Sequence, residues 1–204
     1  MSLPDTAAVI LAGGLARRMG GGDKCRIVVG GRTIIDRTIA CLGPQVGAIA
    51  ISANGDPARF TDLALPVLPD PLPGYPGPLA GVLAGLDWAT RLGAAWLVSV
   101  PGDCPFLPSD LVTRLHEARA EADAVFACAG SGGWTHPVVG LWPVSCDAEL
   151  RAALLAGERK IDAFTGRWVT ATASWRSDSP DPFLNVNSPD DLARAAADAT
   201  TSRE

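Results

Sequence analysis

A chain of 204 residues, 48% of them hydrophobic, is long enough for one α/β domain with a sizeable core. The net charge of −5 argues against general nucleic-acid binding, and no apolar run reaches the ~18 residues of a membrane span. Five cysteines without a C-x-x-C pair argue against a thiolate zinc site and fit reduced thiols. Together these features predict a cytoplasmic protein without membrane or nucleic-acid partners.

Hydrophobic patterning and turn residues predict alternating strands and helices along the chain. Residues 1–6 and 200–204 are expected to be flexible ends. The predicted elements are, in chain order, strand 7–11, strand 26–29, helix 33–42, strand 48–52, strand 66–69, helix 78–92, strand 96–100, helix 109–120, strand 124–129, strand 138–142, helix 144–156, helix 159–165, strand 168–173 and a final helix from 189. This order predicts a single domain, residues 1–204, with a three-layer αβα, Rossmann-like fold and a mixed, mainly parallel sheet.

The loop after the first strand combines glycines with three cations, in the stretch LAGGLARRMGGGDK. Glycines let backbone amides approach a ligand, and arginine and lysine neutralise phosphate charge. The loop is not a standard P-loop, because Cys25 follows Lys24, and the dinucleotide pattern G-x-G-x-x-G cannot be placed in it. A flexible, solvated glycine loop is the alternative, but the strand before it and its cations favour a polyphosphate.

Three further polar residues follow predicted strands, namely Asn54, Asp70 and Asp103. In open α/β sheets, ligands bind beyond the carboxyl ends of the strands, so these residues are expected at one rim with the first loop. By residue type alone, Asp103 is equally a magnesium ligand or a solvated loop carboxylate. Asn54 and Asp70 by themselves are more typical of turns.

Near the end of the chain, Asn185 and Asn187 alternate with a valine, which puts both amides on one side of an extended segment. A loop bound to its own backbone would explain them equally well. His136, before a predicted strand, is expected to be structural or a substrate contact and is a poor candidate for a catalytic base.

The first loop resembles the signature loop of the molybdenum cofactor guanylyltransferases, which are nucleotidyltransferases. Similar segments at 66–81, 101–108 and 183–192 extend the resemblance over most of the chain. The resemblance implies a nucleotidyltransferase fold and a nucleotide site at one sheet rim. The residues that it implies for binding GTP are Leu11, Ala12, Gly13, Gly14, Lys24, Asn54, Asp70 and Asp103. The implied catalytic residues are Arg18, Lys24 and Asp103, and Asp103 is also the implied metal ligand. The implied pterin-binding residues are Asn185 and Asn187.

The implied enzyme transfers GMP from GTP to the terminal phosphate of molybdopterin or its molybdenum form and releases pyrophosphate. Its metal would be Mg²⁺, or Mn²⁺ in its place, held by Asp103. Lys24, Arg18 and the amides of residues 12–14 would hold the phosphates. Other cofactor-biosynthesis proteins and the recipient molybdoenzymes are expected partners.

Three other functions remain open at this point. Two are enzymatic, a cytidylyltransferase for the same pterin and a sugar-phosphate nucleotidyltransferase, and the third is a carrier of pterin cofactor without turnover. The sequence Leu11-Ala12-Gly13-Gly14 favours guanine, because the cytidine relatives usually have alanine at the third position. The residues Cys25-Arg26 depart from the family pattern, which puts the local geometry after Lys24 in question.

Overall fold

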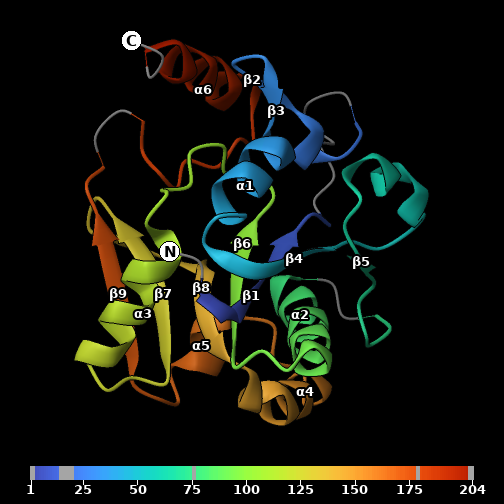
Figure 1. The fold of residues 1–204 in the computed structure, drawn as a ribbon, viewed down its shortest axis with the longest axis vertical. Coiled ribbons are helices and arrows are strands. Elements are labelled where there is room, and N and C mark those ends of the chain that lie inside the picture. The colour runs from blue at the N-terminus through green and yellow to red at the C-terminus, as the bar shows by residue number, and fades with distance from the viewer. Residues whose placement is uncertain (1–2, 14–20, 75–76, 178–179, 202–204) are drawn as a thin grey trace.

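A seven-stranded sheet forms the middle layer of the computed structural model, which describes residues 3–13, 21–74, 77–177 and 180–201 (Figure 1). The strands lie in the order β5-β4-β1-β6-β8-β7-β9. Their bounds are β1 (Leu3–Leu11), β4 (Val46–Ser52), β5 (Val67–Leu68), β6 (Trp96–Pro101), β7 (Phe126–Ser131), β8 (Trp134–Pro143) and β9 (Thr170–Trp175).

Only β8 runs against its neighbours in this sheet: it pairs antiparallel with β6 and β7, while the other pairs are parallel. The turn at Gly132 and Gly133, both with positive φ, joins β7 directly to β8 and allows this reversal. The predicted mixed, mainly parallel sheet is confirmed. The carboxyl ends of the six parallel strands therefore meet at one edge.

Helices cover both faces of the sheet because its strands bury residues on both sides. Along β1, Ala8 and Ile10 pack towards α1 and α3, whereas Ala7 and Val9 pack towards α2. Helices α4 and α5 join α2 on that second side, which confirms the three layers. The helices are α1 (Ile34–Leu42), α2 (Pro78–Leu92), α3 (Leu111–Glu121), α4 (Asp147–Leu155), α5 (Ile161–Thr165) and α6 (Pro189–Thr201), with short 3₁₀ segments η2 (Lys24–Arg26), η3 (Pro57–Leu63) and η4 (Val144–Cys146).

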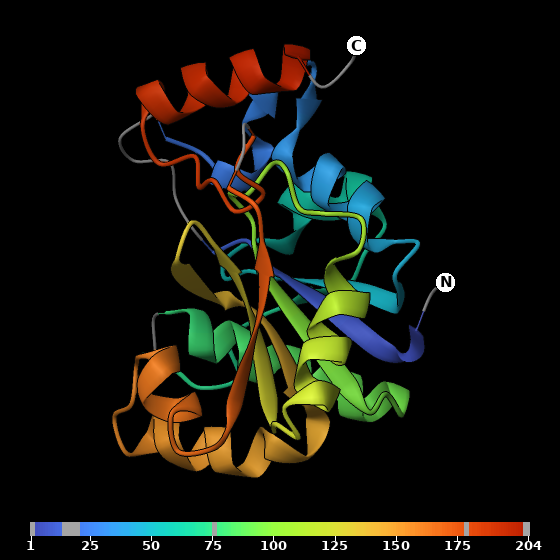
Figure 2. The ribbon, with the colours of Figure 1, turned by 90° about the vertical axis from the view of Figure 1, so that its left-hand side faces the viewer.

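A small third core lies at the end of the molecule, where α6 crosses over the hairpin of β2 (Val28–Val29) and β3 (Arg32–Thr33) (Figure 2). Val29 of the hairpin, Val186 before α6 and Ala195 within it are all fully buried there. This core attaches the C-terminal segment to the segment that follows the first loop.

The predicted start of the first strand was wrong. The first strand begins at Leu3 and not at Ala7, and Thr6 is buried and pairs with Trp96 of β6. Its hydroxyl bonds to His116 Nε2 at 3.0 Å, which lets a polar residue occupy a buried strand. At the other end, α6 continues to Thr201, while residues 1–2 and 202–204 lie outside the described ranges.

Most predicted elements are present with small shifts. The predicted strand 26–29 instead divides into η2 and the first strand of a hairpin, because Gly30 and Gly31 turn the chain with positive φ. Thr33 then caps α1, its hydroxyl accepting from the Asp36 amide at 3.2 Å. None of the helices in the described ranges is long and apolar enough to cross a bilayer.

Candidate active site

A cavity of about 420 Å³ lies at the edge where the carboxyl ends of the parallel strands meet. It is formed by the segments after β1, β4, β5 and β6 and by the first turn of α2. Its lining includes Leu11, Ala12, Gly13, Lys24, Ser52, Asn54, Asp70, Gly77, Pro78, Gly81 and Asp103. The rim predicted from strand ends is thus a concave site of ligand size.

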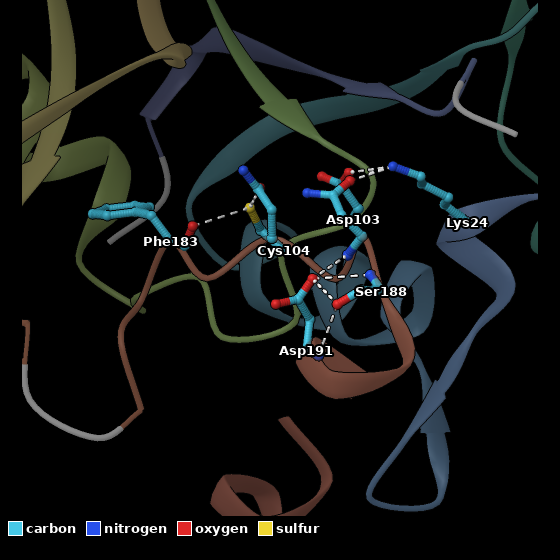
Figure 3. A network of polar contacts seen from close by, with 8 residues as sticks. Lys24, Asp103, Cys104, Phe183, Ser188 and Asp191 are labelled. Atoms are coloured by element: carbon cyan, nitrogen blue, oxygen red, sulfur yellow. Dashed lines mark hydrogen bonds and ion pairs between the residues drawn. The ribbon is translucent and has the colours of Figure 1, made fainter. Parts of the chain in front are cut away.

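Lys24 and Asp103 approach each other across this cavity (Figure 3). Lys24 Nζ lies 3.5 Å from Asp103 Oδ2, and about a fifth of each side chain is exposed. Lys24 also donates a hydrogen bond to the side-chain oxygen of Asn187. Burial raises the pKa of the Asp103 carboxyl above its usual value, and the Lys24 ammonium opposes that shift. The two groups that the sequence placed in one site do share one ligand cavity.

A second cavity of about 430 Å³ adjoins the first, and Asp103, Pro101 and Val138 line both. Asn185 and Asn187 line the second cavity together with His136 and Phe183, whose rings lie 4.9 Å apart. His136 is fixed by a 2.8 Å bond between Nε2 and the Ser131 hydroxyl. Asp103 therefore stands at the junction of two spaces that could hold two substrates.

The segment with the two asparagines is fastened directly to the loop after β6. The amide of Val186 donates to the carbonyl oxygen of Asp103 at 2.9 Å, and the valine side chain points into the small third core. Beyond it, the Asp191 carboxylate accepts from the Ser188 hydroxyl and from the amides of Asn187 and Ser188, which lowers the pKa of Asp191. These bonds hold both asparagines at the second cavity.

Asn54 and Asp70 both line the first cavity, but they also bind each other. Asn54 Nδ2 donates to Asp70 Oδ2 at 2.7 Å, and the Asp70 amide donates to Asn54 Oδ1 at 2.9 Å. Asn54 and Asp70 therefore both stabilise their turns and line the cavity, so the two expectations for these residues are compatible. Each side chain fixes the loop of the other at the cavity wall.

The backbone of the first loop differs from the expected phosphate cradle in one respect. The Ala12 amide donates to the carbonyl oxygen of Ser52 at 2.9 Å, because β1 and β4 continue to pair at this point. Its N–H is therefore not available to a phosphate, although Ala12 lines the cavity. Gly14 and Arg18, also expected at the site, lie outside the described ranges.

Ser52 is a cavity residue that the sequence reasoning missed. It ends β4, is only 4% exposed, and lines the first cavity. Its hydroxyl makes no hydrogen bond to any residue in the described ranges, whereas Asn54, Asp70, Lys24 and Asp103 all have partners. Its position at the end of the predicted strand 48–52 could have identified it as a cavity residue, because strand ends were expected at the rim.

The thiols beside the cavities are not suited to nucleophilic chemistry. Burial raises the pKa of Cys25 to about 12 and the pKa of Cys104 well above its usual value. Cys104 instead donates to Asn185 Oδ1 at 2.8 Å. All five cysteines are unpaired, as expected for reduced thiols.

The oxygen atoms that the protein offers near Lys24 could hold a hard divalent cation only together with oxygens of a bound substrate. No group of three or more histidine, cysteine, aspartate or glutamate side chains gathers anywhere in the part of the chain that is described. Asp103 offers one carboxylate facing the cavity. One carboxylate, completed by phosphate oxygens and water, is the usual protein share of a magnesium site.

Comparison with known proteins is consistent with this geometry. The family model of the MobA-like NTP transferase domain matches residues 8–171. A molybdenum cofactor guanylyltransferase of Rhodopseudomonas palustris is 56% identical over 195 residues, which cover 94% of this chain and 91% of the relative. The chain belongs to the molybdenum cofactor guanylyltransferase family. Membership makes it a nucleotidyltransferase.

Two solved structures show how widely this fold of the guanylyltransferase family is shared. Molybdopterin-guanine dinucleotide biosynthesis protein A from Archaeoglobus fulgidus has a TM-score of 0.73 at 22% identity, covering 97% of this chain and all of the other. The 2-C-methyl-D-erythritol 4-phosphate cytidylyltransferase from Thermus thermophilus has a TM-score of 0.69 at 18% identity, covering 98% and 100%. The second protein is a cytidylyltransferase, so the fold alone does not select the base.

Proposed function

We propose that this protein transfers GMP from GTP to the terminal phosphate of molybdopterin or the molybdenum cofactor and releases pyrophosphate. The observation that supports this most directly is the junction at Asp103. There, a cavity with a cation and an anion 3.5 Å apart opens beside a second cavity lined by two amides. Reactive groups of two bound substrates would meet at that point.

The first cavity suits a nucleoside triphosphate. Lys24 would bind the oxygens of the triphosphate, and Asp103 would hold a divalent metal, for which we propose Mg²⁺ or Mn²⁺. When bound, the metal would neutralise charge on the phosphate oxygens. The first turn of α2 begins with Gly77 and Pro78 at the cavity, and the N-terminus of a helix favours a bound anion because its first N–H groups lack partners within the helix.

The second cavity suits the acceptor. Asn185 and Asn187 would bind and orient the pterin, and His136, which lines the same cavity, would contact it. An oxygen of the acceptor phosphate attacks the α-phosphorus of GTP, and the bond from that phosphorus to the bridging oxygen of the β-phosphate breaks. The attacking phosphate has a second pKa of about 6, so it needs no general base. The protonated thiols nearby, and a histidine that need not act as a base, are compatible with this reaction.

The test is pyrophosphate release by the purified protein with GTP, molybdopterin and a divalent metal. We expect release that requires all three, and a rise in melting temperature with GTP that exceeds the rise with CTP. Release with CTP in place of GTP would instead assign a cytidylyltransferase. Binding of pterin dinucleotide with no release would assign a carrier.

A further prediction concerns Ser52, a buried residue that lines the cavity and whose hydroxyl makes no hydrogen bond to the described part of the chain. We expect Ser52→Ala to weaken GTP binding about 3- to 10-fold, the effect of one neutral hydrogen bond. The melting temperature of the free protein should not fall, because the hydroxyl makes no bond to the described part of the chain. Titration of both proteins with GTP checks this, and equal affinities would show that Ser52 does not contact the nucleotide.

A further inference from the structure

Arg59 connects two of the loops that form the first cavity, although it does not line that cavity. It lies in η3, the segment that follows β4. Its guanidinium reaches back to the first loop, where Nη1 lies 3.1 Å from Asp23 Oδ1. It also donates from Nη2 to the carbonyl oxygen of Asn54 at 2.6 Å. One side chain thus holds the residue before Lys24 and a residue of the cavity wall.

Asp23 depends on this contact. Its side chain is only 12% exposed, and its Oδ1 atom is buried without a hydrogen-bond partner in the described ranges. The ion pair with Arg59 is therefore what compensates the charge on that oxygen. Asp23 is not among the residues that line either cavity. Its place beside Lys24 in the signature loop is explained by an internal contact and not by contact with a substrate.

The contact continues across the cavity wall. Asn54, whose carbonyl receives Arg59, is bonded through its side chain to Asp70. A chain of four residues, Asp23, Arg59, Asn54 and Asp70, therefore joins the loops after β1, β4 and β5. Three segments distant in sequence are held in one relative position by polar contacts.

Arg26 supports Arg59 from the outside. Its guanidinium donates to the Arg59 carbonyl at 2.7 Å and pairs with Asp62 at 2.6 Å. Both guanidinium groups also stack over the ring of Phe60, at 5.3 Å for Arg26 and 5.0 Å for Arg59. The unusual Arg26 of this chain thus anchors η2, which carries Lys24, to η3.

We propose that Arg59 is a positioning residue for the nucleotide, with Asp23 as its counter-ion. Arg59 sets the separation between Lys24 and the wall formed by Asn54 and Asp70, and so fixes the width of the cavity for GTP. This inference depends on the proposed function, because it assumes that GTP occupies the first cavity.

The experiment compares Arg59→Met with the wild-type protein and with Thr61→Ala. Methionine keeps a long apolar stem over Phe60 but removes both polar contacts. We expect the KM for GTP to rise about 10-fold or more, with the KM for molybdopterin unchanged, because misplaced binding groups weaken one substrate only. Thr61→Ala removes an exposed hydroxyl of the same segment, which bonds to the Ala58 carbonyl and contacts neither Asp23 nor Asn54, and it should change the KM for GTP less than twofold.

A double-mutant cycle separates positioning from direct contact. If Asp23 acts only through Arg59, Asp23→Asn raises the KM for GTP in the wild-type protein but gives no further rise in Arg59→Met. If the two effects multiply, Asp23 acts independently of Arg59 and the proposal is wrong. Equal increases in both KM values in Arg59→Met would also overturn it, since they indicate general loss of structure.

The wild-type protein in the same assays tests the proposed function separately. If it neither binds GTP nor releases pyrophosphate, the proposed function fails. If it does both while Arg59→Met matches it, the role of Arg59 alone is refuted.

Discussion

Replacing Lys24 with alanine is expected to lower turnover by about 10²–10³, the loss from removing one preorganised charge contact. Lys24 is the cation that the described structure places in the first cavity, 3.5 Å from Asp103 and bonded to Asn187 at the second. Without it, negative charge on the departing pyrophosphate would lack the compensation that the ammonium supplies. The measurement is the rate of pyrophosphate release at saturating GTP and molybdopterin.

Arg32→Ala is the control for this experiment. Arg32 is an exposed cation of the β2–β3 hairpin and lines neither cavity, so its loss should leave the rate within twofold. Wild-type turnover in Lys24→Ala would refute the assigned role of the lysine. So would an equal loss in both variants, because it would indicate a general effect of charge.

Asp103→Asn is expected to reduce turnover by a similar factor of about 10²–10³ and to raise the metal concentration needed for half-maximal rate. Asparagine keeps the shape of the side chain but removes the negative charge that a divalent cation requires. The backbone bond from Val186 to the Asp103 carbonyl does not involve the side chain, so the loop should keep its conformation. Titration with Mg²⁺ and with Mn²⁺ measures both effects.

Asp110→Asn provides the matched comparison. Asp110 follows the same strand, at the start of α3, but lines neither cavity. It should require the same metal concentration as the wild-type protein. An unchanged metal requirement in Asp103→Asn would show that another group holds the metal.

The order of elements could be predicted because this sheet is buried on both faces. Its strands are short apolar runs between glycine and proline turns, which a single sequence displays clearly. The first strand was placed too late because Thr6 and Asp5 are polar, and the partner of Thr6, His116, lies more than a hundred residues away. A pattern within one segment carries no information on such a partner.

The candidate site was predictable as a place but not in its internal contacts. The rule that ligands bind beyond parallel strands brought Lys24, Asp70 and Asp103 to one rim, where the structure has them. The bond from the Ala12 amide to the Ser52 carbonyl, and the position of Ser52 at the cavity, depend on how far β1 and β4 remain paired. The contacts of Arg59 depend on the path of η3, which no periodicity specifies.

The backbone bond between Val186 and Asp103 joins the loop after β6 to the segment that precedes α6. The described lining of the second cavity is therefore complete only after synthesis has passed Asn187. A nascent chain that ends at Leu184 would contain every described lining residue of the first cavity but neither asparagine of the second. Under the proposed function, the donor cavity would have its described lining earlier in biosynthesis than the acceptor cavity.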